Sequence, residues 1–216
     1  MKLILSLLAA ATICMAGAAS ATMLNGSFYN VGGVQGGGAP LVTTMTAADT
    51  YLAGAPTVDA TFQSTGINYG GPAPFVFSDL GTFLGADSAS LSSNATTSFL
   101  GSIITLTGNI SVAAGANVFD IFSDDGFSLL INNTEIGRFE GLRAPSSSIV
   151  NFNGGTGGVV GFELRHFEGS LTQGALVAKL NGNIITAVPA PATLPLMAGG
   201  LVLLGGMGMR RRRRKS

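Results

Sequence analysis

Short runs that alternate apolar and polar residues, separated by glycine, asparagine and serine, most constrain how the middle of this chain can fold. Phe127, Leu129 and Ile131 alternate with Ser128, Leu130 and Asn132, which is the two-residue period of a strand with one buried face. Asn132 and Asn133 follow at once, and asparagine tolerates the left-handed backbone of a tight hairpin. The chain has no heptad repeat and no long amphipathic helix. The pattern predicts an all-β fold, an antiparallel, jelly-roll-like β-sandwich.

Other segments extend this pattern. Residues 103–112 and 117–122 are rich in β-branched and aromatic side chains, and we expect them to pair as neighbouring strands across a short connection. Phe162, Leu164 and His166 share one face of a later strand. We therefore expect this histidine to pack in the core.

The N-terminus has the three parts of an export signal. Lys2 precedes an apolar run, and the segment closes on Ala19-Ser20-Ala21. A positive start, an apolar core and a small-x-small end predict a signal peptide over residues 1–21, cut by signal peptidase after Ala21. A short buried helix is the alternative. Removal of the signal would remove Cys14, the chain's single cysteine, so no disulfide is expected.

The C-terminus, residues 188–216, has three parts of its own. The first is the proline-containing motif Val188, Pro189, Ala190, Pro191 and Ala192. An apolar stretch over residues 193–209 follows, and about 16 helical residues would span roughly 24 Å of a membrane. The last part is a basic cluster of Arg210, Arg211, Arg212, Arg213, Arg214 and Lys215. A basic cluster after an apolar span stays in the cytoplasm, which predicts a transmembrane helix with the preceding chain exported.

This order of motif, span and arginine cluster resembles the PEP-CTERM sorting signal of Gram-negative bacteria in its VPLPA-like variant. Ala190 stands where that family usually has glutamate or leucine. The resemblance implies that a membrane exosortase cuts near the proline motif and passes the protein to the cell surface or extracellular matrix. An ordinary C-terminal membrane anchor is the alternative.

Charge is strongly segregated along the chain. Residues 22–187, which we expect to form one domain, contain all 11 acidic residues but only four basic ones. The four are Arg138, Arg143, Arg165 and Lys179. This body therefore has a net charge of −7, and it lacks the basic residues that a nucleic-acid partner requires.

Catalytic patterns are weak. His166 is the only histidine, whereas a zinc site needs several histidine or cysteine ligands. No Gly-x-Ser-x-Gly elbow marks a nucleophile, and no spacing marks the carboxylate pair of a glycosidase. We expect a protein that is not an enzyme, with a secreted hydrolase as the second alternative.

Asp124 and Asp125 are the one chemical feature that stands out. The sequence Ser-Asp-Asp-Gly lies between two expected strands, and adjacent carboxylates repel unless water solvates them or a cation binds between them. Oxygen-rich loops suit Ca²⁺. The alternative is a solvated turn in which aspartate caps free N–H groups and Gly126 has an unusual backbone angle.

The residues around this pair resemble a known family. Residues 123–132, 161–168 and 174–176 are similar to the protective-antigen/flocculin-type β-sandwich, and the similarity covers about residues 98–182. It implies that Asp124 and Asp125 hold Ca²⁺ and bind sugar hydroxyls. Glu168 stands near the position where sugar-binding members have an asparagine ligand, so it is the third candidate.

Together these observations predict an exported cell-surface or extracellular-matrix protein with a structural or adhesive role in biofilm or exopolysaccharide. Its expected partners are signal peptidase, the exosortase and an extracellular polysaccharide. The alternative function is a Ca²⁺-dependent, lectin-like carbohydrate-binding module.

Overall fold

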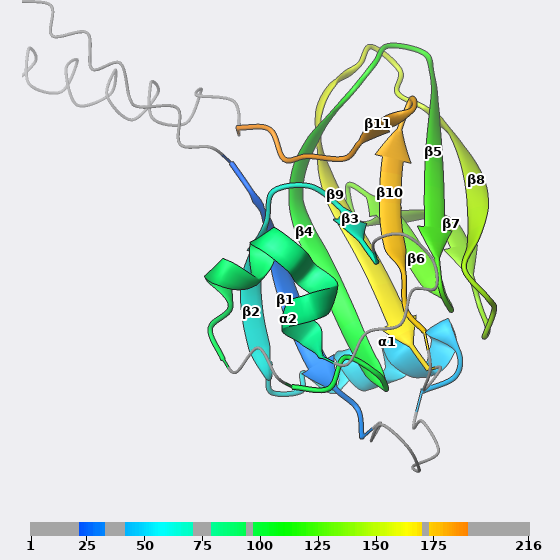
Figure 1. Ribbon diagram of the computed structural model, residues 1–216. Coiled ribbons are helices and arrows are strands. Elements are labelled where there is room, and N and C mark those ends of the chain that lie inside the picture. The colour runs from blue at the N-terminus through cyan, green and yellow to red at the C-terminus, as the bar shows by residue number, and fades with distance from the viewer. Residues whose placement is uncertain (1–21, 33–41, 71–78, 94–96, 170–172, 190–216) are drawn as a thin grey trace, which may run out of the picture.

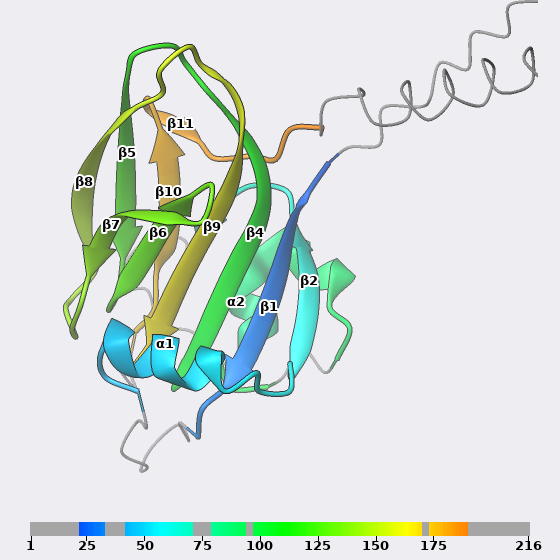
Figure 2. The same ribbon diagram turned by 180° about the vertical axis from the view of Figure 1, so that it is seen from behind.

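Two antiparallel sheets pack face to face (Figures 1 and 2) in the computed structural model, which describes residues 22–32, 42–70, 79–93, 97–169 and 173–189. The six-stranded sheet has the order β2 (Ala60–Ser64), β1 (Leu24–Asn30), β4 (Ser102–Val112), β9 (Gly158–Glu168), β6 (Phe127–Ile131) and β7 (Thr134–Phe139). The other has the order β11 (Asn183–Ile184), β10 (Leu176–Leu180), β5 (Ala116–Ser123) and β8 (Ser146–Asn153), with β3 (Asn68–Tyr69) also paired to β10. The predicted all-β antiparallel sandwich is confirmed.

The core lies between the sheets because every second side chain of each strand points inward. In β5, for example, Phe119 and Ile121 are buried while Val118 is exposed. β4 and β9 pair along their full lengths, from Ser102 opposite Glu168 to Val112 opposite Gly158. β9 also pairs with β6, with His166 opposite Phe127, and this places the end of β9 next to the β5–β6 loop.

The predicted pairing of residues 103–112 with 117–122 is wrong. These segments form β4 and β5, which lie in different sheets. The chain turns the corner between sheets at Gly115, whose φ is +74°. Asn117 holds the corner: its amide donates to the carbonyl oxygens of Ala113 and Gly115 at 2.9 and 3.0 Å. Both strands thereby keep an apolar face on the core.

The hairpin predicted at Asn132-Asn133 is confirmed. β6 and β7 pair on either side of it, and both asparagines have positive φ, 49° and 62°. His166 is fully buried, as expected, and its Nδ1 lies 3.0 Å from the carbonyl oxygen of Gly126.

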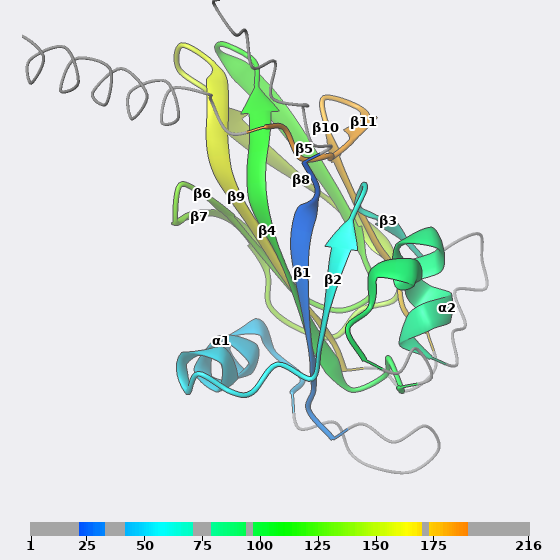
Figure 3. The same cartoon turned by 90° about the vertical axis from the view of Figure 1, so that its left-hand side faces the viewer.

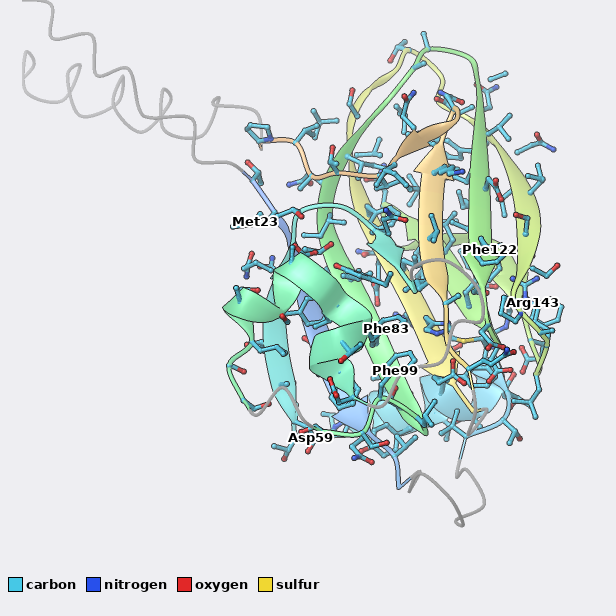
Figure 4. The ribbon with its side chains drawn as sticks, viewed as in Figure 1. Met23, Asp59, Phe83, Phe99, Phe122 and Arg143 are labelled. Atoms are coloured by element: carbon cyan, nitrogen blue, oxygen red, sulfur yellow. The ribbon has the colours of Figure 1, made fainter. Side chains whose placement is uncertain are left out.

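Three short helices complete the fold. α1 (Met45–Ala53) lies on the outer face of the six-stranded sheet, and α2 (Leu80–Leu84) with the 3₁₀ helix η1 (Gly85–Ser90) lies on the opposite side of β1 and β2 (Figure 3). Phe83 of α2 stacks on Phe99 with ring centroids 3.7 Å apart (Figure 4). α2 and η1 thus cover the part of the inner face near β1 and β2.

The predicted signal peptide, with Ala19 and Ala21, lies outside the described residues. So do the predicted span and the basic cluster that follows it. Val188 is described, and its N–H donates to the carbonyl oxygen of Asn109 at 2.9 Å. No helix within the described ranges is both long and apolar enough to cross a bilayer.

Candidate functional site

The loop between β5 and β6 contains the predicted pair Asp124 and Asp125. The N–H of Asp124 donates to the carbonyl oxygen of Ala175 at 2.9 Å, and the N–H of Asp125 donates to that of Arg143 at 3.2 Å. The Ser123 hydroxyl donates to the Asp125 carbonyl oxygen at 2.8 Å. Segments distant in sequence therefore fix the position of this loop.

Asp125 uses its side chain to join two of these segments. Its Oδ1 accepts the N–H of Arg143 at 3.0 Å, and its Oδ2 accepts the N–H of Gly169 at 2.7 Å. Only 1% of the residue is exposed. Its backbone is left-handed, with φ of 65°, a conformation that aspartate adopts more readily than most residues.

Asp124 is in a different electrostatic position. It is buried, and its Oδ2 has no hydrogen-bond partner among the described residues. Burial, followed by the charge of Asp125, raises the pKa of Asp124 to about 7. An ionised carboxylate in such a place is costly, so Asp124 requires either a proton or a cation.

Arg143 is a positive side chain that interacts electrostatically with both carboxylates. Its guanidinium donates to Ser148 at 2.8 Å and to Ser123 at 2.7 Å, and it lies 4.1 Å from the ring centroid of Phe139. Burial lowers the pKa of Arg143, while Asp124 and Asp125 raise it. No described ion pair joins Arg143 to either carboxylate within 4.0 Å.

Arg143 therefore acts on the pair electrostatically, without a described ion pair to either carboxylate. Sequence reasoning missed the role of Arg143, although it is one of only four basic residues in the body. Figure 4 shows it near the start of β8, where β5 ends.

Glu168, the third candidate, is buried at the end of β9. Its backbone neighbour Gly169 bonds to Asp125, and its Oε2 would lie 3.0 Å from a Cβ at Gly174. Glu168 is therefore one residue away from a backbone group that bonds to the β5–β6 loop. Within the described ranges, however, no three histidine, cysteine, aspartate or glutamate side chains are grouped so that they could hold a metal ion.

The alternative of a solvated turn holds in one respect, because Asp125 accepts two backbone N–H groups, but it is wrong in two others. Both aspartates are buried, with at most 2% exposed. The left-handed residue is Asp125, whereas Gly126 is needed for space: a Cβ there would meet Phe167 and lie 2.8 Å from the Phe139 carbonyl oxygen. Close packing against β7 and β9 explains the glycine.

The chemistry of this loop fits a hard cation. Ca²⁺ takes six to eight oxygen ligands, and Asp124 offers a buried carboxylate oxygen that no described group binds. Two adjacent carboxylates would supply part of such a set. Backbone carbonyls, water or ligand hydroxyls would have to supply the rest.

No family model and no curated protein matches this chain. Solved structures do match it. A structure described as the PA14 sugar-binding domain from an RTX adhesin superposes with a TM-score of 0.60 at 22% identity, over 79% of this chain and 100% of that one. The PA14 domain of the antifreeze protein MpAFP gives 0.61 at 18%, over 76% and 90%. This chain shares their fold.

A third match is more distant in sequence. The epithelial adhesin 6 A domain of Candida glabrata, solved in complex with Galβ1-3GlcNAc, gives a TM-score of 0.54 at 12% identity, over 81% of this chain and 91% of that one. At such low identities the likeness establishes a common sandwich architecture.

Proposed function

We propose that this protein is an adhesive, non-catalytic module that binds carbohydrate through Ca²⁺ held at Asp124 and Asp125. One observation carries the proposal: Asp124 has a buried carboxylate oxygen without a described hydrogen-bond partner, next to a second buried carboxylate. The fold supports it, since two similar structures are described as a sugar-binding domain and as an adhesin domain with a bound disaccharide.

The two aspartates would have different roles. Asp125 bonds two backbone N–H groups and so fixes the loop, while Asp124 presents the available oxygen. When bound, Ca²⁺ would supply open coordination positions for vicinal sugar hydroxyls. Arg143 would keep Ser123 and Ser148 in place around the loop.

We also propose that the module works outside the cell, at the surface or in the extracellular matrix. This part rests on the sequence of the two ends. Signal peptidase would remove residues 1–21, and an exosortase would process the chain near Pro189, with Arg210 to Lys215 left in the cytoplasm.

The test is the thermal midpoint of the full chain with Ca²⁺ and with chelator. Ca²⁺ at about 100 times its Kd would stabilise the folded state by about 2.7 kcal/mol, a shift of several degrees. The double variant Asp124→Asn, Asp125→Asn should lose that shift. Asp59→Asn, at an exposed aspartate away from the loop (Figure 4), should keep it.

Binding of the same samples to a panel of sugars is then measured with Ca²⁺ and with chelator. Binding that requires Ca²⁺ and is lost in the double variant supports the proposal. No shift at millimolar Ca²⁺ would overturn the ion site and leave a structural role for the sandwich.

A further inference from the structure

Among the described strands, the sheets have edges at β2, β7 and β8, and at β11 and β3, which both pair with the free side of β10. An exposed edge presents unpaired N–H and C=O groups to any other strand, and proteins usually protect it. β2 is covered by the chain after η1: Ser92 donates its N–H to the Thr61 carbonyl oxygen and accepts the Thr61 N–H at its hydroxyl. β11 and β3 have only two residues each.

β7 is protected by charge. Glu135 and Arg138 lie on this edge strand and form an ion pair of 2.9 Å, and Arg138 also pairs with Asp49 of α1. Charged side chains of this kind discourage pairing with another strand.

β8 has none of these protections. It is eight residues long, Ser-Ser-Ser-Ile-Val-Asn-Phe-Asn, without charge or proline. It lies at the outer edge of its sheet in Figures 1 and 2. Ile149, in its middle, is 60% exposed, the largest fraction among the exposed large apolar residues of the described chain.

The register shows which backbone groups β8 leaves open. Val118 of β5 points its backbone toward β10, because its N–H and carbonyl oxygen both bond to Asn181. Backbone direction alternates along a strand, so Phe119 and Ile121 point toward β8. Their partners there are Val150 and Ser148.

The intervening residues of β8 therefore point away from the sheet. Ser147, Ile149 and Asn151 each present an N–H and a carbonyl oxygen outward, and no described residue bonds to these groups. Pro145 comes just before the strand and has no N–H to offer at the next outward position.

We propose that β8 pairs antiparallel with β8 of a second copy of this chain, around a two-fold axis at Ile149. Ile149 would then face its own copy, and Ser147 would face Asn151 on both sides of the axis. These three outward pairs would form about six backbone hydrogen bonds. The two Ile149 side chains would cover each other, flanked by pairs of polar side chains that can hydrogen-bond.

A second copy suits this edge better than a charged partner. Residues 22–187 have a net charge of −7, with 11 acidic and four basic residues, so two copies repel least where they meet through a surface without charged side chains. β8 is such a surface. On the adjacent strand β5, Asp120 lies opposite Ile149, and Val118, which is 40% exposed, lies opposite Asn151.

Cross-linking tests the register directly. In the full chain with Cys14→Ser, Ile149→Cys should form a disulfide-linked dimer on mild oxidation, because facing residues of such a pair have Cα atoms about 5.5 Å apart. Ser147→Cys alone should cross-link poorly, because its two copies would lie four residues apart in register, roughly 13 Å. Val159→Cys, on an exposed apolar residue of β9, is the matched control.

Sedimentation velocity of the full chain in mild detergent tests the association itself. Ile149→Lys places two like charges opposite each other and should weaken the dimer by at least about tenfold. Asn151→Pro removes one outward N–H and should weaken it without loss of the bonds to β5. Val159→Lys should dimerise like the wild type.

Three results would overturn the proposal. The first is a chain that stays monomeric at high concentration, and the second is an Ile149→Lys variant that associates like the wild type. The third is Ile149→Cys cross-linking no faster than Val159→Cys. Thermal midpoints of all variants establish that each one folds.

Discussion

At the scale of single residues, Asp124 gives the calcium-free protein an unusual dependence of stability on pH. Burial and the charge of Asp125 raise its pKa from 3.8 to about 7. The folded state thus holds a proton that the unfolded state releases above pH 3.8. The stabilisation is fully present below that pH and is lost as pH rises through about 7. Asp124→Asn has no such titration. The free energy of unfolding of the variant minus that of the wild type should therefore increase by about 2 kcal/mol from pH 5 to pH 8.

His166 acts in the opposite direction. Burial is the main cause that lowers its pKa from 6.5 to about 4, so its contribution is present above pH 6.5 and is lost as pH falls through 4. In the wild type the two slopes partly cancel between pH 4 and 6.5. Urea unfolding in the presence of chelator at pH 5, 6.5 and 8 measures the free energy of unfolding of the wild type and of Asp124→Asn. Parallel curves for Asp124→Asn and wild type would contradict the role of Asp124.

Gly126 gives a prediction about packing. A methyl group there would meet Phe167 and the Phe139 carbonyl oxygen, so Gly126→Ala should destabilise the fold by about 1–3 kcal/mol through overpacking. Gly141→Ala is the control, because no atom lies within 4 Å of a Cβ at that position. Thermal unfolding compares the two variants, and equal midpoints would show that the loop moves freely.

The site was only partly predictable from sequence. Adjacent carboxylates between two strands are visible in the chain itself, so Asp124 and Asp125 could be found. Arg143 and Gly169 could not, because they reach Asp125 from 18 and 44 residues away. Their contact depends on how β7, β8 and β9 are arranged.

At the scale of elements, α1 is attached to the sheet by both apolar and ionic contacts. Met45 and Ala48 are buried against Ile103 and Phe167, while Asp49 pairs with Arg138 at 2.8 Å and Arg165 at 2.9 Å.

Asp49→Asn tests the ionic attachment of α1. It keeps the side-chain shape and loses both pairs, and since these groups are 25–29% exposed, the cost should be at most about 1 kcal/mol in low salt. The cost should shrink in 1 M NaCl, because salt screens exposed charges. Urea unfolding of wild type and variant at both salt concentrations measures it, and a cost that does not change with salt would argue for a packing role.

Strands were easier to predict than their partners. Alternation identifies a strand because one face must be buried, and the β6–β7 hairpin followed from Asn132 and Asn133 because a two-residue turn leaves no other pairing. The connection from β4 to β5 carries no such turn, and the corner at Asn117 sends β5 into the other sheet. α1 was missed because a nine-residue helix with two buried side chains leaves little periodic signal.

At the scale of the whole molecule, the candidate ion site and the open edge are neighbours. Arg143 bonds to Ser123 beside the aspartates and to Ser148 in β8. Ser148 points its backbone inward, whereas pairing of two copies would use the outward groups of Ile149 and its neighbours. Both surfaces can therefore be used at once, and variants at Ile149 should leave the response to Ca²⁺ unchanged.

Proton and cation compete for the same carboxylate, and this competition distinguishes a real ion site from general attraction to an acidic body. With the pKa of Asp124 at about 7, most molecules would have to release a proton before they bind Ca²⁺ at pH 6, but few at pH 8. Ca²⁺ affinity should therefore be about tenfold weaker at pH 6 than at pH 8. Calorimetric titration at both pH values measures the ratio, and buffers of different ionisation enthalpy count the protons released at pH 6. Equal affinities without proton release would mean that Ca²⁺ binds elsewhere on the acidic surface, because exposed carboxylates are already ionised at both pH values.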